Sequence, residues 1–245
     1  MKKKISQKAP SRELSAHSKT QFYFATGIYR SSLLKKVQLK PFLNELENDV
    51  FQLSQSDHKG VEWSAQNYVN GYTSYSSLDR LDLMTDSFLK LRKKIDGHVQ
   101  TFLTELNYDC DIKDLMMTQC WVNVMFENAV HASHIHPHSV ISGTFYVRVP
   151  ESSSPIKFED PRLGYFMNSP EVHSKAPESF QRFIKFHNKP GDLVLFESWL
   201  RHEVPVMTRH EVPVRQQTKK SSAKTSKKSK DSEPRISISF NYGKK

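Results

Sequence analysis

Six short runs in the second half of the chain decide the fold. They are CWVNVMF (residues 120–126), SGTFYVRVP (142–150), SPIKF (154–158), FIKF (183–186), GDLVLF (191–196) and RISISFNY (235–242). Each is rich in β-branched and aromatic residues, and Pro, Gly, Ser and Asn separate them, as is typical of strands joined by turns. Six or more short strands within about 130 residues favour a β-sandwich or a double-sheet jelly roll.

Two helical patterns precede these strands. Apolar residues at helical spacing follow Pro41, and a second stripe follows Thr85, which is a plausible N-cap. Between them, residues 54–77 are polar and aromatic with little periodicity, and FYFATGIY (22–29) favours a short strand or a packing arm. Helices followed by strands indicate an α+β, mainly β chain rather than alternating βαβ units.

Composition excludes several classes of protein. The 245 residues include two cysteines, Cys110 and Cys120, which are too few for a disulfide scaffold or a four-cysteine zinc site. No apolar run approaches the roughly 20 residues of a membrane span, and the charged N-terminus lacks the apolar stretch of a signal peptide. We therefore expect a reduced, cytoplasmic protein that does not enter a membrane.

The net charge of +10 is concentrated outside the folded body. Residues 1–12 hold five Lys or Arg and no acid, and residues 215–233 hold seven against two acids. The hexapeptide RHEVPV occurs at 201–206 and again at 209–214, just before this Lys/Ser-rich stretch. Such segments usually stay solvated, so a groove that follows a nucleic-acid backbone is less favoured than the raw charge suggests.

These observations predict the domain organisation. We expect a disordered basic tail over 1–19 and a single domain over 20–245. Within that domain a helical support region covers 20–110 and a jelly-roll core covers 111–245, interrupted by a basic low-complexity insertion over about 207–233.

Four histidines in HASHIHPHS (131–139) form a candidate metal site. Histidines separated by one residue point to the same side of a strand, so both can reach one ion, and imidazole suits Fe, Zn, Cu or Ni. A further ligand has to come from elsewhere, and His202 directly follows the strand 193–196. His210, in the second copy of RHEVPV, is the competitor for that role.

The last strand supplies a candidate anion site. Arg235, Ser237 and Ser239 share one face of RISISFNY, and Ile236 and Ile238 lie on the other. An Arg and a Ser two residues apart inside a barrel can bind a carboxylate through the guanidinium fork and a hydroxyl. The alternative is an edge strand with its polar face in water.

Taken together, four blocks resemble the 2-oxoglutarate- and Fe(II)-dependent oxygenases. They are HxHPxSxxSGxxYVxxP (134–150), FxDPR (158–162), GDLxLFxSWLxH (191–202) and RISISFN (235–241), and WVN at 121–123 also fits. The resemblance covers roughly residues 20–245 apart from the insertion. It implies a double-stranded β-helix, the jelly-roll barrel shared with cupins, with the N-terminal helices packed on one sheet.

The resemblance also implies roles for individual residues. Three histidines would hold Fe(II), and four other side chains would bind 2-oxoglutarate, the far carboxylate lying on Arg235. The metal ligands are His134, His136 and His202, and the cosubstrate residues are Arg235, Ser237, Tyr146 and Asn123. No catalytic residue beyond the metal centre is expected.

One departure from the wider class concerns His136, which stands where most of these enzymes place Asp or Glu. Three arrangements stay open. All three histidines ligate, or only His134 and His202 do, or His136 and His138 form the pair. Asp160 in FEDPR is an outside candidate for a carboxylate ligand, although its Pro and Arg neighbours favour a structural turn.

The leading hypothesis is therefore an oxygenase that uses Fe(II), 2-oxoglutarate and O2 to hydroxylate a C–H bond, releasing succinate and CO2. One rival is a cupin-type three-His dioxygenase or isomerase that needs no 2-oxoglutarate. The other is a non-enzymatic jelly-roll module that binds a polyanion through the basic insertion. Expected partners are 2-oxoglutarate, O2 and a prime substrate, with a weak polyanion contact through the insertion; a homodimer is compatible with this pattern.

Overall fold

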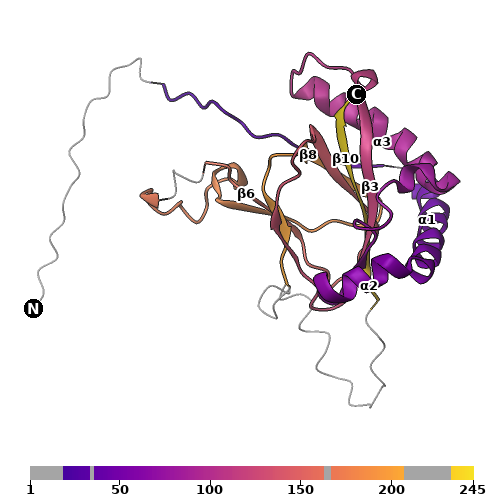
Figure 1. Cartoon of the computed structure of the whole chain (residues 1–245). Helices are drawn as coiled ribbons and strands as arrows, with labels where there is room; N and C mark the ends of the chain where they lie inside the picture. The colour runs from indigo at the N-terminus through magenta and orange to yellow at the C-terminus, as the bar shows by residue number, and fades with distance from the viewer. Residues whose placement is uncertain (1–18, 34–35, 163–166, 207–232) are drawn as a thin grey trace, which may run out of the picture.

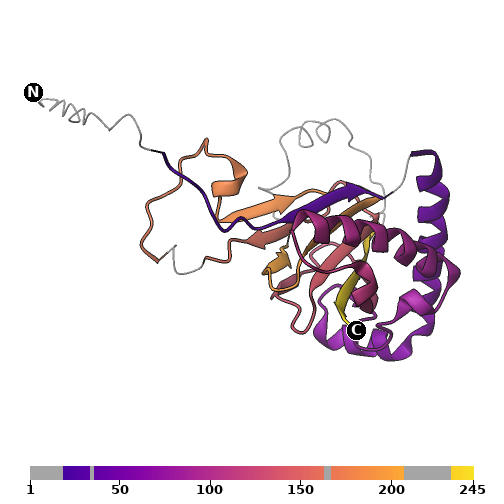
Figure 2. The ribbon, with the colours of Figure 1, turned by 90° about the horizontal axis from the view of Figure 1, so that it is seen from above.

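Two antiparallel sheets face each other, and helices cover the outer side of the larger sheet (Figure 1). This arrangement comes from a computed structural model that describes residues 19–33, 36–162, 167–206 and 233–245. Seen from above, the helices lie on one side of the sheets and the segment before β1 extends away on the other (Figure 2).

The larger sheet has six strands. In spatial order these are β1 (Ile28–Ser32), β8 (Asp192–Glu197), β5 (Ile141–Arg148), β10 (Arg235–Lys244), β3 (Leu115–Met125) and β2 (Gly71–Thr73). The smaller sheet has four, in the order β4 (His131–His134), β9 (His202–Val204), β6 (Ile156–Glu159) and β7 (Phe183–Phe186). From β3 onward the chain passes repeatedly between the two sheets, which is the winding of a double-stranded β-helix. The predicted mainly β jelly roll is confirmed.

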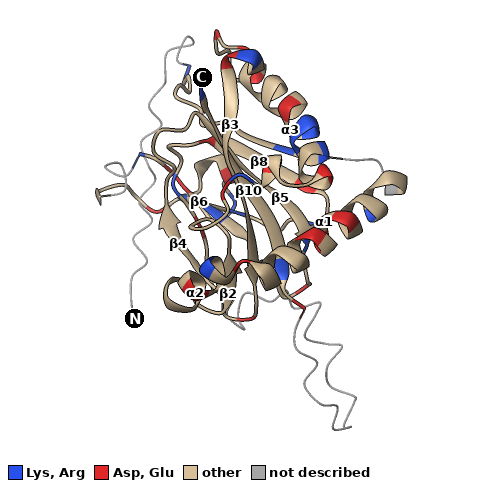
Figure 3. Ribbon diagram, turned by 45° about the vertical axis from the view of Figure 1, so that its right-hand side comes forward, with Lys and Arg blue, Asp and Glu red and all other residues tan. Residues whose placement is uncertain are grey.

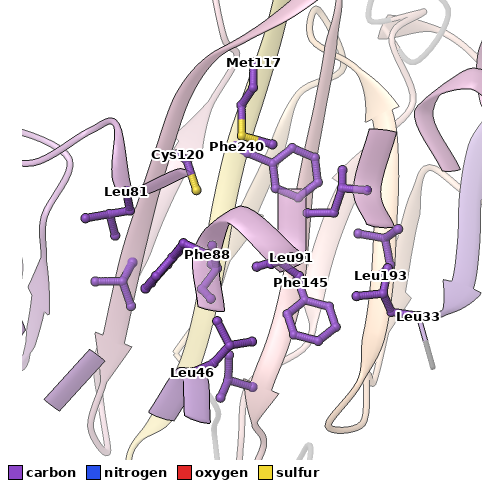
Figure 4. Packing of buried hydrophobic residues seen from close by; sticks show 14 of the residues in the cluster. Leu33, Leu46, Leu81, Phe88, Leu91, Met117, Cys120, Phe145, Leu193 and Phe240 are labelled. Atoms are coloured by element: carbon purple, nitrogen blue, oxygen red, sulfur yellow. The ribbon is translucent and has the colours of Figure 1, made fainter. Parts of the chain in front are cut away.

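Three helices pack against the larger sheet. They are α1 (Lys36–Ser56) and α3 (Asp86–Glu105), which share the core with the sheet, and α2 (His58–Asn67), which lies against the edge strand β2. The 3-10 turns η1 (Leu81–Leu83) and η2 (Ile112–Asp114) contact α3, whereas η4 (Glu178–Phe180) lies elsewhere, where Phe180 meets Phe22. Thr85 caps α3 as predicted, because its side chain accepts a hydrogen bond from Phe88 N. Figure 4 shows Leu46 of α1 and Phe88 of α3 in the same buried cluster as Phe145 and Phe240 of the sheet.

Alternate side chains of β10 point to two different buried regions: the hydrophobic core under the helices and the cavity between the two sheets. Ile236, Ile238 and Phe240 are fully buried in the core between sheet and helices. Arg235 and Ser237, on the opposite face, line the cavity between the two sheets. One strand thus supplies both the main hydrophobic core and the interior of the barrel.

Acidic and basic side chains are interspersed on the helices (Figure 3). Lys90 of α3 and Glu45 of α1, for example, form an exposed ion pair of 2.8 Å between the two helices. Among the residues that the structure describes, no helix is both long and apolar enough to span a bilayer.

The structure corrects several boundaries predicted from the sequence. Helix α1 begins at Lys36, five residues before Pro41, and strand β1 begins only at Ile28. The stretch 54–77 holds α2 and β2, and so contains regular structure that its weak periodicity did not predict. The predictions for the tail and the insertion concern residues 1–18 and 207–232, which lie outside the described residues.

Candidate metal and cosubstrate site

Two neighbouring strands of the smaller sheet bring the predicted metal ligands together. His134 ends β4 and His202 begins β9, and the two residues are directly paired across the strands. His136 lies two residues beyond β4, where its backbone N–H donates to the Ser198 carbonyl at 2.9 Å. One ring nitrogen from each histidine lies within 4.8 Å of the others, and Nε2 of His136 and of His202 are 3.2 Å apart. The three imidazoles can therefore hold one metal ion.

Backbone carbonyls orient two of these rings. Nδ1 of His134 is 2.7 Å from the Ala132 carbonyl oxygen, and Nδ1 of His202 is 2.9 Å from the Leu200 carbonyl oxygen. An Nδ1–H that donates to a carbonyl leaves the Nε2 lone pair free to ligate, and such partners are typical of metal-binding histidines.

Burial keeps the cluster neutral. It lowers the pKa of His202 to about 2 and that of His136 to about 4, with a further decrease from His134 in each case. Burial is also the main cause of the lowered pKa of His134 and of His131, the latter to about 3. Neutral imidazole is the form that ligates a metal, so the site needs no deprotonation at neutral pH.

The predicted anion site lies in the same cavity. Arg235 is 5% exposed, and its Nη1 donates to the Met125 thioether sulfur at 2.8 Å. Its Nε has no hydrogen-bond partner among the described residues, and the same holds for the buried hydroxyl of Tyr146. The guanidinium carbon lies 5.1 Å from the centre of the Tyr146 ring. A buried cation without an anion is costly, so this end of the cavity fits a carboxylate ligand.

The other predicted cosubstrate residues stand on neighbouring strands. Ser237 pairs with Asn123 of β3 and with Tyr146 of β5, and all three side chains are buried. Ser237 and Asn123 line the cavity together with the histidines. Thr73 donates a hydrogen bond to the Asn123 side-chain oxygen at 2.9 Å, and the Asn123 amide donates to Ser239 at 3.2 Å. Asn123 is therefore held within the wall of the cavity by its own neighbours.

The structure separates the alternative ligands. His138 has a left-handed backbone (φ 67°) and is not part of the three-histidine cluster. The Asp160 carboxylate accepts two hydrogen bonds from the Arg162 side chain, at 3.0 and 2.6 Å, and one from the Arg162 backbone, which makes it part of a turn. The competitor His210 lies outside the described residues.

His131 is a cavity residue to which the sequence assigned no role. Its ring stacks on His134 with centroids 4.5 Å apart and lines the cavity. A regular strand would turn residues 131 and 134 to opposite faces, but the register between β4 and β9 shifts between them. The one sequence signal for a role of His131 is its place in the dense four-histidine run 131–138.

A comparison with protein families agrees with the resemblance found in the sequence. Residues 119–214, from β3 to beyond β9, match the family model described as "Putative 2OG-Fe(II) oxygenase". The resemblance found in the sequence is thereby confirmed. No curated protein matches the chain.

Solved structures with the same fold are distant in sequence. SnoN, an alpha ketoglutarate dependent epimerase from nogalamycin biosynthesis, has 13% identity and a TM-score of 0.53 over 89% of this chain and 79% of its own. A Pseudomonas putida prolyl-4-hydroxylase has 10% identity and a TM-score of 0.52 over 90% and 94%. HygX from Streptomyces hygroscopicus has 12% identity and a TM-score of 0.51 over 90% and 84%. At these identities the likeness establishes the fold.

Proposed function

We propose that this chain, which carries a domain of the 2OG-Fe(II) oxygenase family over residues 119–214, is an Fe(II)- and 2-oxoglutarate-dependent oxygenase. It would hydroxylate a C–H bond of an organic substrate and release succinate and CO2. The observation that carries the proposal is a single cavity with two matched ends. Three neutral histidines converge at one end, and at the other stands the buried Arg235, which forms no ion pair with any residue that the structure describes.

The residues present fit both groups. His134, His136 and His202 would hold the iron through Nε2, since imidazole nitrogen is a preferred ligand of Fe(II). When bound, the iron together with 2-oxoglutarate and O2 would supply the oxidising chemistry. Arg235 would bind the far carboxylate through its planar fork, which fixes the direction in which the cosubstrate enters.

Other side chains of the cavity exclude water and support this orientation. Trp121 is nearly fully buried, and the centres of its ring and the His136 ring are 5.8 Å apart. The ring centres of Phe196 and His202 are 4.5 Å apart. Both residues line the cavity. In a dry site the charge–charge attraction between Arg235 and a carboxylate is much stronger than it is in water.

The solved relatives support the cosubstrate and not a particular substrate. SnoN has been crystallised with Fe3+ and alpha ketoglutarate, and HygX with nickel, 2-oxoglutarate and hygromycin B. The Pseudomonas putida relative is a prolyl-4-hydroxylase. The substrates named for these relatives differ in chemical class, so we transfer only 2-oxoglutarate, which is present in the SnoN and HygX structures.

The test is succinate formation by the purified protein under air with Fe(II) and 2-oxoglutarate. We expect more moles of succinate than moles of enzyme. No succinate should form when the metal is chelated or when His202 is replaced by Ala. His173→Ala, which changes an exposed histidine outside the cluster, is the matched control and should retain turnover. Iron binding without any 2-oxoglutarate consumption would support the cupin-type rival instead. Metal-independent, salt-sensitive binding of a polyanion with no turnover would support the binding module.

Three further expectations stay proposals. We propose a cytoplasmic location, a weak polyanion contact through the insertion over about 207–233, and a homodimer. Cell fractionation tests the location, and recovery in the membrane fraction would contradict it. A binding titration with heparin at increasing salt tests the polyanion contact, and salt-independent binding would contradict it. Light scattering tests the homodimer, and a monomeric mass would contradict it.

A further inference from the structure

Tyr68 is a buried phenol that is not among the site residues predicted from the sequence. It is the C-cap residue of α2, outside the barrel strands, and its backbone N–H donates to the Ser64 carbonyl. The side chain is 7% exposed, and its ring belongs to a small cluster with Met125, Ala129 and Val204. Among the described residues no atom forms a hydrogen bond with the Tyr68 hydroxyl. Buried hydroxyls are rarely left in this state, so the group calls for a ligand or a bound water.

The local backbone is built to admit this ring. A Cβ on Gly71 would lie 2.6 and 2.7 Å from two carbons of the Tyr68 ring, and 2.8 Å from the Val124 carbonyl. Only glycine at this position therefore lets the ring approach the backbone of residue 71 this closely. The ring also meets His131 edge-on, with centroids 5.5 Å apart.

Two neighbours of Tyr68 line the cavity. Met125 belongs to the same buried cluster as Tyr68 and lies at the Arg235 end, and His131 meets the Tyr68 ring edge-on and stacks on His134. Met125 accepts the hydrogen bond from Arg235, the residue with which it pairs between β3 and β10. Burial raises the pKa of Tyr68 to about 12, while the nearby Arg235 charge acts to lower it. The phenol thus stays protonated and can donate.

Among the described residues, three buried donors near Arg235 have no acceptor. They are the Tyr68 hydroxyl, the Tyr146 hydroxyl and Nε of Arg235. A carboxylate has about four lone-pair positions and no donor, so one such group could accept from all three. A neutral ligand or a single water could satisfy fewer of them and would leave the guanidinium charge uncompensated.

We propose that Tyr68 completes the subsite for the far carboxylate of 2-oxoglutarate by donating its hydroxyl to it. The inference rests on the proposed function and extends it to a residue contributed by a helix end outside the barrel. It also explains why α2 and Gly71 hold a polar ring deep in an apolar cluster. Removing the hydroxyl alone should weaken binding of 2-oxoglutarate about tenfold, as expected for one hydrogen bond to a charged acceptor.

The test compares two ligands with two variants by calorimetry. Tyr68→Phe and the wild-type protein are loaded with Mn(II) without oxygen. One sample of each is titrated with 2-oxoglutarate and a separate sample with pyruvate, which has the 2-oxo acid end but no far carboxylate. We expect about tenfold weaker binding of 2-oxoglutarate and unchanged binding of pyruvate. The matched control is Tyr29→Phe, whose hydroxyl bonds to His98 away from the cavity and should leave both affinities unchanged.

Three results would overturn the inference. Unchanged 2-oxoglutarate affinity in Tyr68→Phe would show that the hydroxyl makes no contact with the cosubstrate. An equal loss for both ligands would show a general effect on the site rather than a contact with the far carboxylate. If the wild-type protein with Mn(II) does not bind 2-oxoglutarate at all, the proposed function fails, and this inference fails with it. A thermal melt of Tyr68→Phe close to that of the wild type makes the first two results interpretable.

Discussion

Replacing Arg235 by Ala should raise the apparent KM for 2-oxoglutarate steeply while iron binding stays largely intact. Arg235 is 5% exposed, its Nη1 donates to a thioether, and its Nε has no partner within the part of the chain that the structure describes. The far carboxylate of 2-oxoglutarate would supply an anion in a bidentate pair. Removing one partner of a buried ion pair typically costs about 3–5 kcal/mol, because the other charge is left buried and unpaired.

This cost corresponds to roughly two to three and a half decades in affinity for the cosubstrate. Arg235→Lys should recover only part of it, since a point charge cannot reproduce the planar fork. Ser237→Ala should cost less, about 1 kcal/mol, because it removes a single neutral donor.

The assay is a titration of 2-oxoglutarate with succinate as the readout, paired with iron content for each variant. Arg235→Met serves as the folding control. It removes a buried, uncompensated charge while keeping a long side chain, so we expect it to fold at least as stably as the wild type without ligand. An unaltered KM in Arg235→Ala would refute the carboxylate assignment. Loss of iron in Arg235→Met, with its fold intact, would refute the separation of the two ends of the cavity.

Four further predictions concern the metal ligands, the insertion and pH. His134→Ala and His202→Ala should each abolish bound iron, measured by metal analysis, whereas His210→Ala should keep it; the reverse pattern would transfer the distal ligand to His210. His136→Asp should retain the metal, since carboxylate is the commoner third ligand, and an unchanged ligand field of the Fe(II) site would argue against coordination by residue 136. Deleting residues 215–233 should preserve folding and 2-oxoglutarate decarboxylation, because long polar insertions cost little; loss of circular-dichroism signal would contradict this. Folding lowers the pKa of His202 to about 2 from an ordinary value near 6.5, so below pH 6.5 the unfolded chain binds a proton that the folded protein does not. His202 alone should therefore reduce the unfolding free energy of the metal-free protein by about 1.4 kcal/mol per pH unit in that range, and the other cavity histidines with lowered pKa values add to the loss. A flat profile in urea denaturation between pH 7 and 5 would contradict the buried neutral state.

The parts of the fold that the sequence predicted are those whose patterns follow from local periodicity. The alternation of β10 predicted which side chains enter the barrel, and Arg235 and Ser237 lie there. The stripe from Phe88 to Leu106 predicted α3, with its cap at Thr85. In both elements one face is continuously apolar, so the residue spacing carries the signal.

Helix α2 carried no such signal. Its buried positions are Gly60 and Ser64, small residues that let the helix approach its neighbours without an apolar stripe. Its start is set by Asp57, whose side chain accepts from Gly60 N and from the Tyr72 hydroxyl, a contact across fifteen residues. Tertiary contacts of this kind leave no periodic pattern.

The candidate site divides in the same way. His134, His136 and His202 were predicted because the HxH spacing and the strand before His202 are local features, and the structure brings them together. His131 required a register shift in β4, and Tyr68 required the ring to fold over Gly71 from another part of the chain. Both depend on packing between segments that the sequence does not bring together by spacing.

A crystal structure of the protein with Mn(II) and 2-oxoglutarate, prepared without oxygen, tests the central claim most directly. We predict one ion bonded to His134, His136 and His202, and one 2-oxoglutarate whose far carboxylate lies on Arg235. An ion held by other residues, or a 2-oxoglutarate molecule outside this cavity, would contradict the account.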